Sequence, residues 1–126
     1  MGLLWSEGVE FARGIMSPPL LRTVLGQPSW LFESSHVSAN LTQVGGHLAP
    51  VVFRLGEKTV SPYSVAPWAE ETLGPGLPPL LHALRGDFFC APFGGNGTPW
   101  RGERHPPHGE TANANWSLDA FEKSDS

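Results

Sequence analysis

The chain has 126 residues, the length of one modest domain that can bury a core. Its formal net charge is −4, and no basic run supplies the clustered cations that nucleic acid or an anionic membrane surface requires. Fifteen Gly and thirteen Pro disfavour long helices, whereas 40% hydrophobic residues and five Trp exceed what a disordered chain carries. The composition therefore predicts an ordered all-β protein with long loops.

Targeting signals and cysteine content bear on location. The N-terminal residues show no basic segment, sustained apolar run or small-residue cleavage site, and no stretch approaches the length of a membrane span. The single cysteine, Cys90, cannot form an intrachain disulfide, and its Phe-Phe-Cys-Ala-Pro setting favours a buried structural thiol over a reactive one. We therefore expect a cytoplasmic protein with neither membrane nor nucleic acid among its partners.

Two short helical segments are predicted near the start. Apolar residues within 1–18 follow an amphipathic pattern that ends at Pro18-Pro19, an unfavourable continuation for a helix. Residues 20–25 can form one further helical turn, which Gly26 would close.

An antiparallel hairpin is predicted next. Residues 36–43 alternate apolar and polar side chains, and residues 48–55 do so again after the Gly45-Gly46 turn. Glycine gives that turn the freedom needed for a tight reversal. Pro50 cannot donate to a ladder, so it should lie at an edge or a bulge.

The rest of the chain is predicted to be mainly loop. Residues 59–80 contain five Pro, which suits a long surface excursion anchored by Trp68. Residues 94–98 and 102–107 are also loop, whereas residues 116–121 alternate as a further strand would.

The stretch from Ala83 to Trp116 carries the most distinctive motifs. An Arg-Gly turn at Arg85 is followed by a Pro-Phe-Gly segment at 92–94, and His108-Gly109 comes eight positions before the tryptophan. In their order and spacing these motifs resemble the first active-site segment of the aldose 1-epimerase (galactose mutarotase-like) superfamily, in particular its glucose-6-phosphate 1-epimerase-like branch. Residues 44–53 resemble the early hairpin of that family.

The resemblance, which covers roughly residues 36–121, implies an antiparallel β-sandwich. Such sandwiches commonly run to about 200–250 residues as one domain, so residues 1–126 are expected to be a single domain or the N-terminal segment of a larger sandwich. In the second case the second catalytic histidine and the glutamate base of the family would follow later. In the first case a small sandwich can pair as a homodimer that covers its sheet edges.

The resemblance also implies a function, namely anomeric epimerisation of an aldose or sugar phosphate with a small-molecule sugar as partner and no cofactor. His108 matches the first histidine of the family and would hydrogen-bond the sugar. Arg85 matches the arginine of the turn that helps bind an anionic substrate, and a salt bridge to Asp87 is an equal alternative. The position of the family's second arginine holds Ala112, so phosphate specificity is not implied.

Two further side chains suit a sugar site. Asn113 offers an amide for sugar hydroxyls, and Trp100 is the tryptophan best placed to stack on a pyranose ring. His105 and His108 are disfavoured as a metal pair because no third ligand is evident. The alternative function is a non-catalytic sugar-binding or structural β-sandwich module, since fold alone does not separate these classes.

Overall fold

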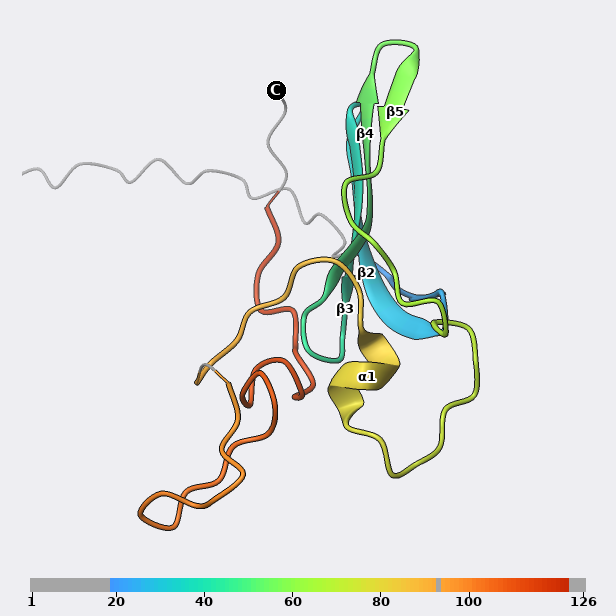
Figure 1. Ribbon diagram of the computed structural model, residues 1–126. Coiled ribbons are helices and arrows are strands. Elements are labelled where there is room, and N and C mark those ends of the chain that lie inside the picture. The colour runs from blue at the N-terminus through green and yellow to red at the C-terminus, as the bar shows by residue number, and fades with distance from the viewer. Residues whose placement is uncertain (1–18, 93, 123–126) are drawn as a thin grey trace, which may run out of the picture.

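The computed structural model describes residues 19–92 and 94–122. Its strands form one antiparallel sheet in sequence order (Figure 1), namely β1 (Leu21–Val24), β2 (Gln27–Glu33), β3 (Val37–Thr42), β4 (Leu48–Leu55) and β5 (Lys58–Val60). The one helix in these ranges, α1 (Pro79–Ala83), has five residues, and no helix there is long and apolar enough to cross a membrane. The described chain is therefore an all-β fold built on an open sheet.

The hairpin predicted from alternation is confirmed. β3 and β4 pair antiparallel with Val37 opposite Phe53, and both glycines of the Gly45-Gly46 turn have positive φ. The register shifts between Ala39 and Leu41, and there the Asn40 amide donates to the Pro50 carbonyl at 3.0 Å. Pro50 thus lies at an irregularity of the ladder, where its missing N–H is tolerated.

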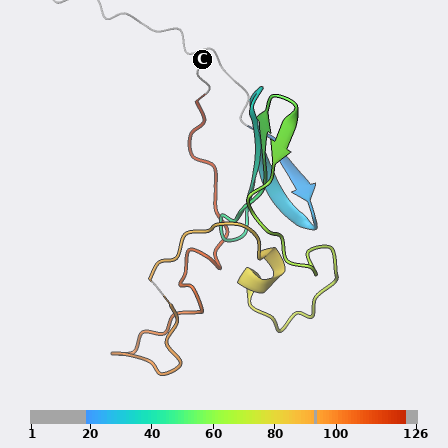
Figure 2. The ribbon, with the colours of Figure 1, turned by 45° about the horizontal axis from the view of Figure 1, so that its top comes forward.

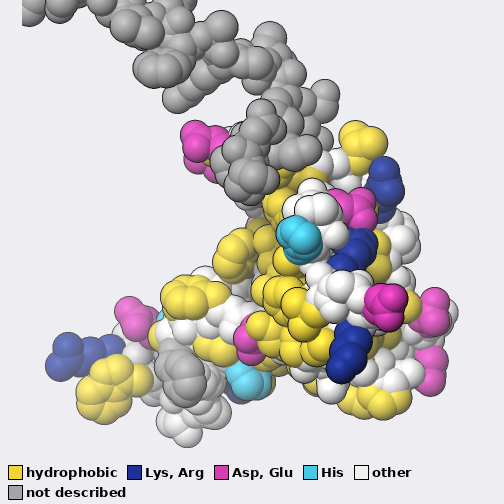
Figure 3. All heavy atoms as spheres, turned by 90° about the horizontal axis from the view of Figure 1, so that it is seen from above, with side chains coloured by type: hydrophobic (Ala, Val, Ile, Leu, Met, Phe, Trp, Pro, Cys, Tyr) yellow, Lys and Arg dark blue, Asp and Glu magenta, His cyan; other side chains and the backbone are white. Residues whose placement is uncertain are grey.

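The two faces of the sheet differ in chemistry. The registers place Trp30, Phe32, Val51 and Phe53 on one face, and the ring of Phe121 lies 6.1 Å from that of Phe32. The C-terminal stretch therefore packs on the apolar face. Viewed from above, hydrophobic side chains gather along one side of the sheet and charged ones along the other (Figure 3).

The base of the opposite face is covered by α1. The side chain of Gln27 donates to the main-chain oxygen of His82 at 3.1 Å, and Ser29 and Thr42 on this face are fully buried. Farther along the same face, Arg54 and Glu33 form an ion pair at 3.2 Å near solvent. The helix was not predicted, because the proline-rich sequence around it indicates a loop.

Two predicted elements differ in the structure. Residues 20–25 are not helical: β1 pairs with β2, with Leu21 opposite Trp30, and the Leu25-Gly26 turn joins the two strands. Cross-strand pairing here outweighs weak helix propensity. Residues 116–121 form no strand; the N–H of Trp116 donates to the Gln43 carbonyl at 2.8 Å, after which no ladder follows. The helix predicted within 1–18 lies outside the described residues.

Residues 94–110 form loops that extend away from the sheet, whereas residues 61–78 pass around the other side of α1 (Figure 2). These two excursions contain most of the irregular structure. The segment that joins them, residues 84–92, returns to the lower end of β4, where the predicted site residues begin.

Candidate functional site

Main-chain hydrogen bonds attach residues 84–116 to the β3–β4 turn. The N–H of Leu48 donates to the Asp87 carbonyl at 2.7 Å, and the N–H of Gly45 donates to the Ala114 carbonyl at 2.8 Å. At Gly86 a Cβ atom would collide with the carbonyl of Leu48, so only glycine permits this approach. The turn and the distal segment therefore form one unit.

His47 lies at the centre of this unit and is fully buried. Its Nδ1 accepts a hydrogen bond from the Arg85 N–H at 3.3 Å, so the neutral ring carries its proton on Nε2. Nε2 is buried and makes no hydrogen bond with any described residue. The Ala112 main chain interacts with the ring and favours its protonated form. This interaction does not meet the geometry of a hydrogen bond at Nε2.

The charge state of His47 is set mainly by burial. Desolvation lowers the pKa of His47 below 6.5, and the main-chain contact with Ala112 opposes this shift without cancelling it. Electrostatic interactions with Arg85 and His108 lower the pKa further. His47 is therefore a neutral ring at physiological pH.

An aromatic contact leads from His47 to His108. The His47 ring stacks on Phe88 with centroids 4.3 Å apart, and the Phe88 ring meets His108 edge to face at 5.3 Å. Nδ1 of His108 also lies 3.6 Å from Sγ of Cys90. Cys90 is only half-buried, and not the core thiol that its apolar neighbours predict.

His108 itself is exposed and has a left-handed backbone, with φ of 64°. A residue with a Cβ pays about 1–2 kcal/mol for that conformation. The next residue, Gly109, is buried against the carbonyls of Ala91 and Pro92, where no side chain fits. Close packing of Gly109 thus sets the backbone that presents the imidazole of His108 to solvent.

Arg85 occupies a different environment from the one expected. Its side chain is 2% exposed, and the guanidinium donates to the carbonyls of Ala83, Val24 and Leu25 at 2.9 to 3.0 Å. Each of its three nitrogens thus bonds the main chain. The guanidinium joins α1 to the β1–β2 turn and does not line an open cleft, nor does it pair with Asp87.

Neither Asn113 nor Trp100 has a hydrogen bond or ring contact with the imidazole of His108, although Asn113 bonds the main chain on both sides of that residue. The Asn113 amide donates to the carbonyls of Pro107 and Gly109 and accepts from the N–H of Leu80, so its polar atoms serve the fold. Trp100 is 71% exposed, with the guanidinium carbon of Arg101 at 5.7 Å from its ring. Of the predicted sugar contacts, Trp100 and His108 remain open to solvent.

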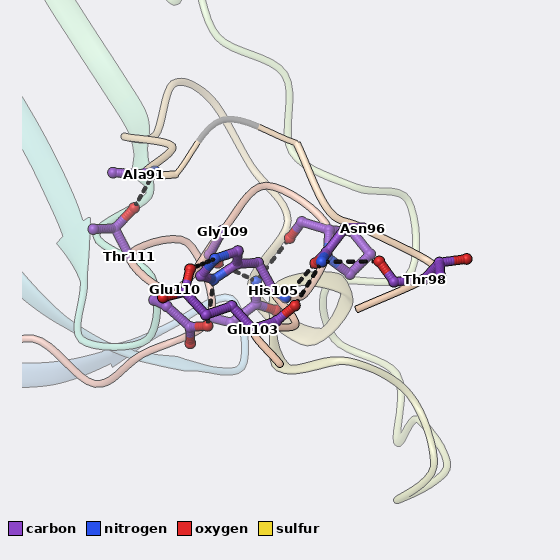
Figure 4. Close-up of polar contacts among 10 residues, drawn as sticks. Ala91, Asn96, Thr98, Glu103, His105, Gly109, Glu110 and Thr111 are labelled. Carbon is purple, nitrogen blue, oxygen red and sulfur yellow. Dashed lines mark hydrogen bonds and ion pairs between the residues drawn. The ribbon is translucent and has the colours of Figure 1, made fainter. Parts of the chain in front are cut away.

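A hollow of about 650 Å³ lies in the protruding loops, lined by residues 95–97 and 104–107. His105 forms part of it, with Nδ1 at 3.3 Å from Glu110 and Nε2 at 3.8 Å from Glu103 (Figure 4). The Asn96 side chain holds the walls together through bonds to His105, Thr98 and Glu103. His108 does not line this hollow.

Sequence reasoning missed His47 and Phe88. Both belong to otherwise recognised segments, the Gly-Gly turn and the stretch after the Arg-Gly turn. For His47 the sequence does contain one signal. It follows the glycine turn directly, at a position where strand alternation directs the side chain toward the interior.

Within the described residues no three His, Cys, Asp or Glu side chains form a group that could hold a metal ion. Comparison of the chain with protein-family models, with characterised proteins and with solved structures finds no match.

Proposed function

We propose that this chain is a carbohydrate-binding, aldose 1-epimerase-like protein whose His108 hydrogen-bonds a small-molecule sugar. The observation that carries the proposal is an exposed imidazole whose Nδ1 lies beside Cys90 while Nε2 has no partner among the described residues. A positioned ring with one free nitrogen can donate to or accept from a sugar oxygen. A left-handed backbone at a non-glycine residue is typical of functional positions.

The substrate we propose is a neutral aldose. The resemblance assigns the binding of an anionic substrate to Arg85, and the guanidinium of Arg85 is fully engaged with main-chain carbonyls. Anomeric epimerisation requires a base and an acid besides a sugar-orienting group; His108 would supply the orienting group. The wider proposal includes a β-sandwich of galactose mutarotase type and a cytoplasmic location, and the alternative is a non-catalytic sugar-binding module on the same scaffold.

Calorimetric titration with glucose, galactose and glucose 6-phosphate tests this proposal. The parent should bind a neutral aldose, and His108→Ala should weaken binding by about 2- to 150-fold, the range that one lost hydrogen bond of about 0.5–3 kcal/mol gives. His36→Ala is the matched control, because His36 is exposed at the β2–β3 turn. The 6-phosphate should bring no gain in affinity.

Absence of binding by the parent to any of the three sugars would refute the carbohydrate proposal. Anomer exchange followed by NMR then separates turnover from binding: a chain that binds without accelerating exchange is the non-catalytic module. Cys90→Ser should change sugar affinity less than His108→Ala does, since the serine hydroxyl keeps a hydrogen-bonding group beside Nδ1 of His108.

A further inference from the structure

We propose that His47, a buried residue on the β3–β4 turn, is a positioning residue that fixes the imidazole of His108 through the ring of Phe88. The role proposed for His47 rests on the ligand-contacting role proposed above for His108. It adds a residue that contacts no ligand and that lies 61 positions away in the chain.

The first step of the argument is the way His47 is held. Its ring is fully buried, its Nδ1 receives the N–H of Arg85, and the space beside it is closed by Gly45, where a Cβ would fall 2.7 Å from the ring. Burial and the hydrogen bond to Arg85 restrain the ring. It is therefore a fixed surface on the sheet side of the site.

The second step is the transfer of that position to Phe88. The two rings stack nearly parallel, with an interplanar angle of 19° and centroids 4.3 Å apart. Asp87, the preceding residue, is attached to β4 through the Leu48 N–H. Stacking and backbone attachment together determine the orientation of the Phe88 ring.

The third step is the contact with His108. Phe88 meets it at 77°, an edge-to-face geometry that aromatic pairs favour. His108 is exposed, so few other contacts restrain its ring, and its Nδ1 lies 3.6 Å from the thiol of Cys90. Phe88 and Cys90 thus both contact the ring of His108.

A purely structural role for His47 would not require an aromatic ring. The hydrogen bond to Arg85 needs only an acceptor at the position of Nδ1, which asparagine also provides, whereas stacking needs only a flat ring, which phenylalanine provides. The buried, unpaired Nε2 gives the fold no hydrogen bond and carries a desolvation cost. The part of His47 that contacts the site is thus its ring face, which stacks on Phe88.

Two readouts that need no sugar report on His108. The first is the NMR signal of its ring protons, which are sensitive to the orientation of the Phe88 ring. The second is the alkylation rate of Cys90 by iodoacetamide, which is unambiguous because the chain has one cysteine and its sulfur lies beside Nδ1.

Three variants divide the contributions. His47→Asn keeps the acceptor and removes the ring; His47→Phe keeps the ring and removes the acceptor; Phe88→Leu removes the middle ring and leaves His47 in place. We expect His47→Asn and Phe88→Leu to move the His108 ring signals and to change the Cys90 alkylation rate by at least about threefold. His47→Phe should retain both parent values, and His36→Asn is the control.

The inference is overturned if His47→Asn leaves both readouts at the parent values, or if His47→Phe disturbs them as much as His47→Asn does. Should His47→Asn fail to fold, Phe88→Leu decides through alkylation, because loss of the Phe88 ring current alone moves the His108 signals: an unchanged Cys90 alkylation rate in that variant also overturns it. Sugar titration of the same proteins separates the two proposals. A parent that binds no sugar refutes the function and leaves the ring contacts to be judged by NMR and alkylation.

Discussion

The sheet and the segment of residues 84–116 hold their shapes in different ways. In the sheet, ladders join β1 through β5 in sequence order, so neighbouring strands are also neighbours in the chain. In the distal segment, side chains bond to main-chain atoms, as Asn96, Thr111, Asn113 and Trp116 do. Many substitutions should therefore be tolerated in the sheet, whereas residues 84–116, the distal segment, depend on particular side chains.

The most severe test of this difference compares two glycines with similar backbones. Gly86 has φ of 49° and would place a Cβ against the Leu48 carbonyl, whereas Gly56, at the β4–β5 turn, has φ of 64° and nothing within 4 Å. Gly86→Ala should lose more than about 3 kcal/mol of unfolding free energy in urea, because strain and collision add. Gly56→Ala should lose only about 1 kcal/mol. Equal losses would show that the segment does not press on β4.

A second comparison uses two arginines. Arg85→Met should cost about 3–5 kcal/mol, because it removes three hydrogen bonds and leaves buried carbonyls without donors. Arg54→Met, on the sheet, breaks a partly exposed ion pair with Glu33 and should cost less than about 1 kcal/mol. Urea midpoints of the two variants check this. A small loss at Arg85 would mean that its guanidinium can be replaced and is free for other roles.

The same division explains what the sequence predicted. Alternation with period two predicted the bounds of β3 and β4 to within one or two residues. The two strands pair with each other across a short turn, so the local sequence contains most of the information. It misled at residues 116–121, where similar alternation reflects packing of Phe121 on Phe32 without a neighbouring strand to pair with. The β1 strand was missed because four residues before a glycine carry little periodic signal.

Local motifs directed attention to residues 84–116, and they did not predict the orientation of the side chains there. The His-Gly motif did mark an exposed imidazole, since Gly109 is needed for close packing. That Arg85 turns inward depends on carbonyls of Val24 and Leu25, about sixty positions earlier. A contact of that range leaves no trace in the spacing of a motif, and the stack of His47 on Phe88 is of the same kind.

Acidification should lower the free energy of unfolding through His47, which lies where the sheet meets residues 84–116. Burial lowers the pKa of folded His47 below the 6.5 of an exposed histidine, so the unfolded chain binds a proton more readily. Stability from this residue is therefore complete above about pH 6.5 and is lost as the pH falls toward the folded pKa. Urea unfolding between pH 7.5 and about 5 should show this decline in the parent.

His47→Asn should reduce the decline, because the variant no longer has a group that titrates differently in the two states. His36→Asn is the control, since His36 is exposed. An unchanged pH dependence in His47→Asn would show that other groups cause the acid-dependent loss of stability and that the β3–β4 turn does not contribute to it.

The smallest expected effect concerns Tyr63, on the loop after β5, where the excursion of residues 61–78 meets the distal segment. The Asp87 carboxylate raises the pKa of Tyr63 above 10.0, through a side-chain hydrogen bond first and its negative charge second. Both contacts favour the protonated phenol, so Asp87→Asn should bring the pKa of Tyr63 back toward 10.0. The chain has one tyrosine, so phenolate absorbance during an alkaline titration reports this residue alone, with circular dichroism recorded alongside to verify that the fold persists.

Asp119→Asn is the control: it removes another exposed carboxylate and should leave the Tyr63 titration unchanged. The N–H of Gly86 also donates to the Ser64 carbonyl at 2.8 Å, so the backbone attachment should survive and stability should change little. An unaltered Tyr63 titration in Asp87→Asn would show that the excursion is held to the distal segment by its backbone alone, as the strands of the sheet are.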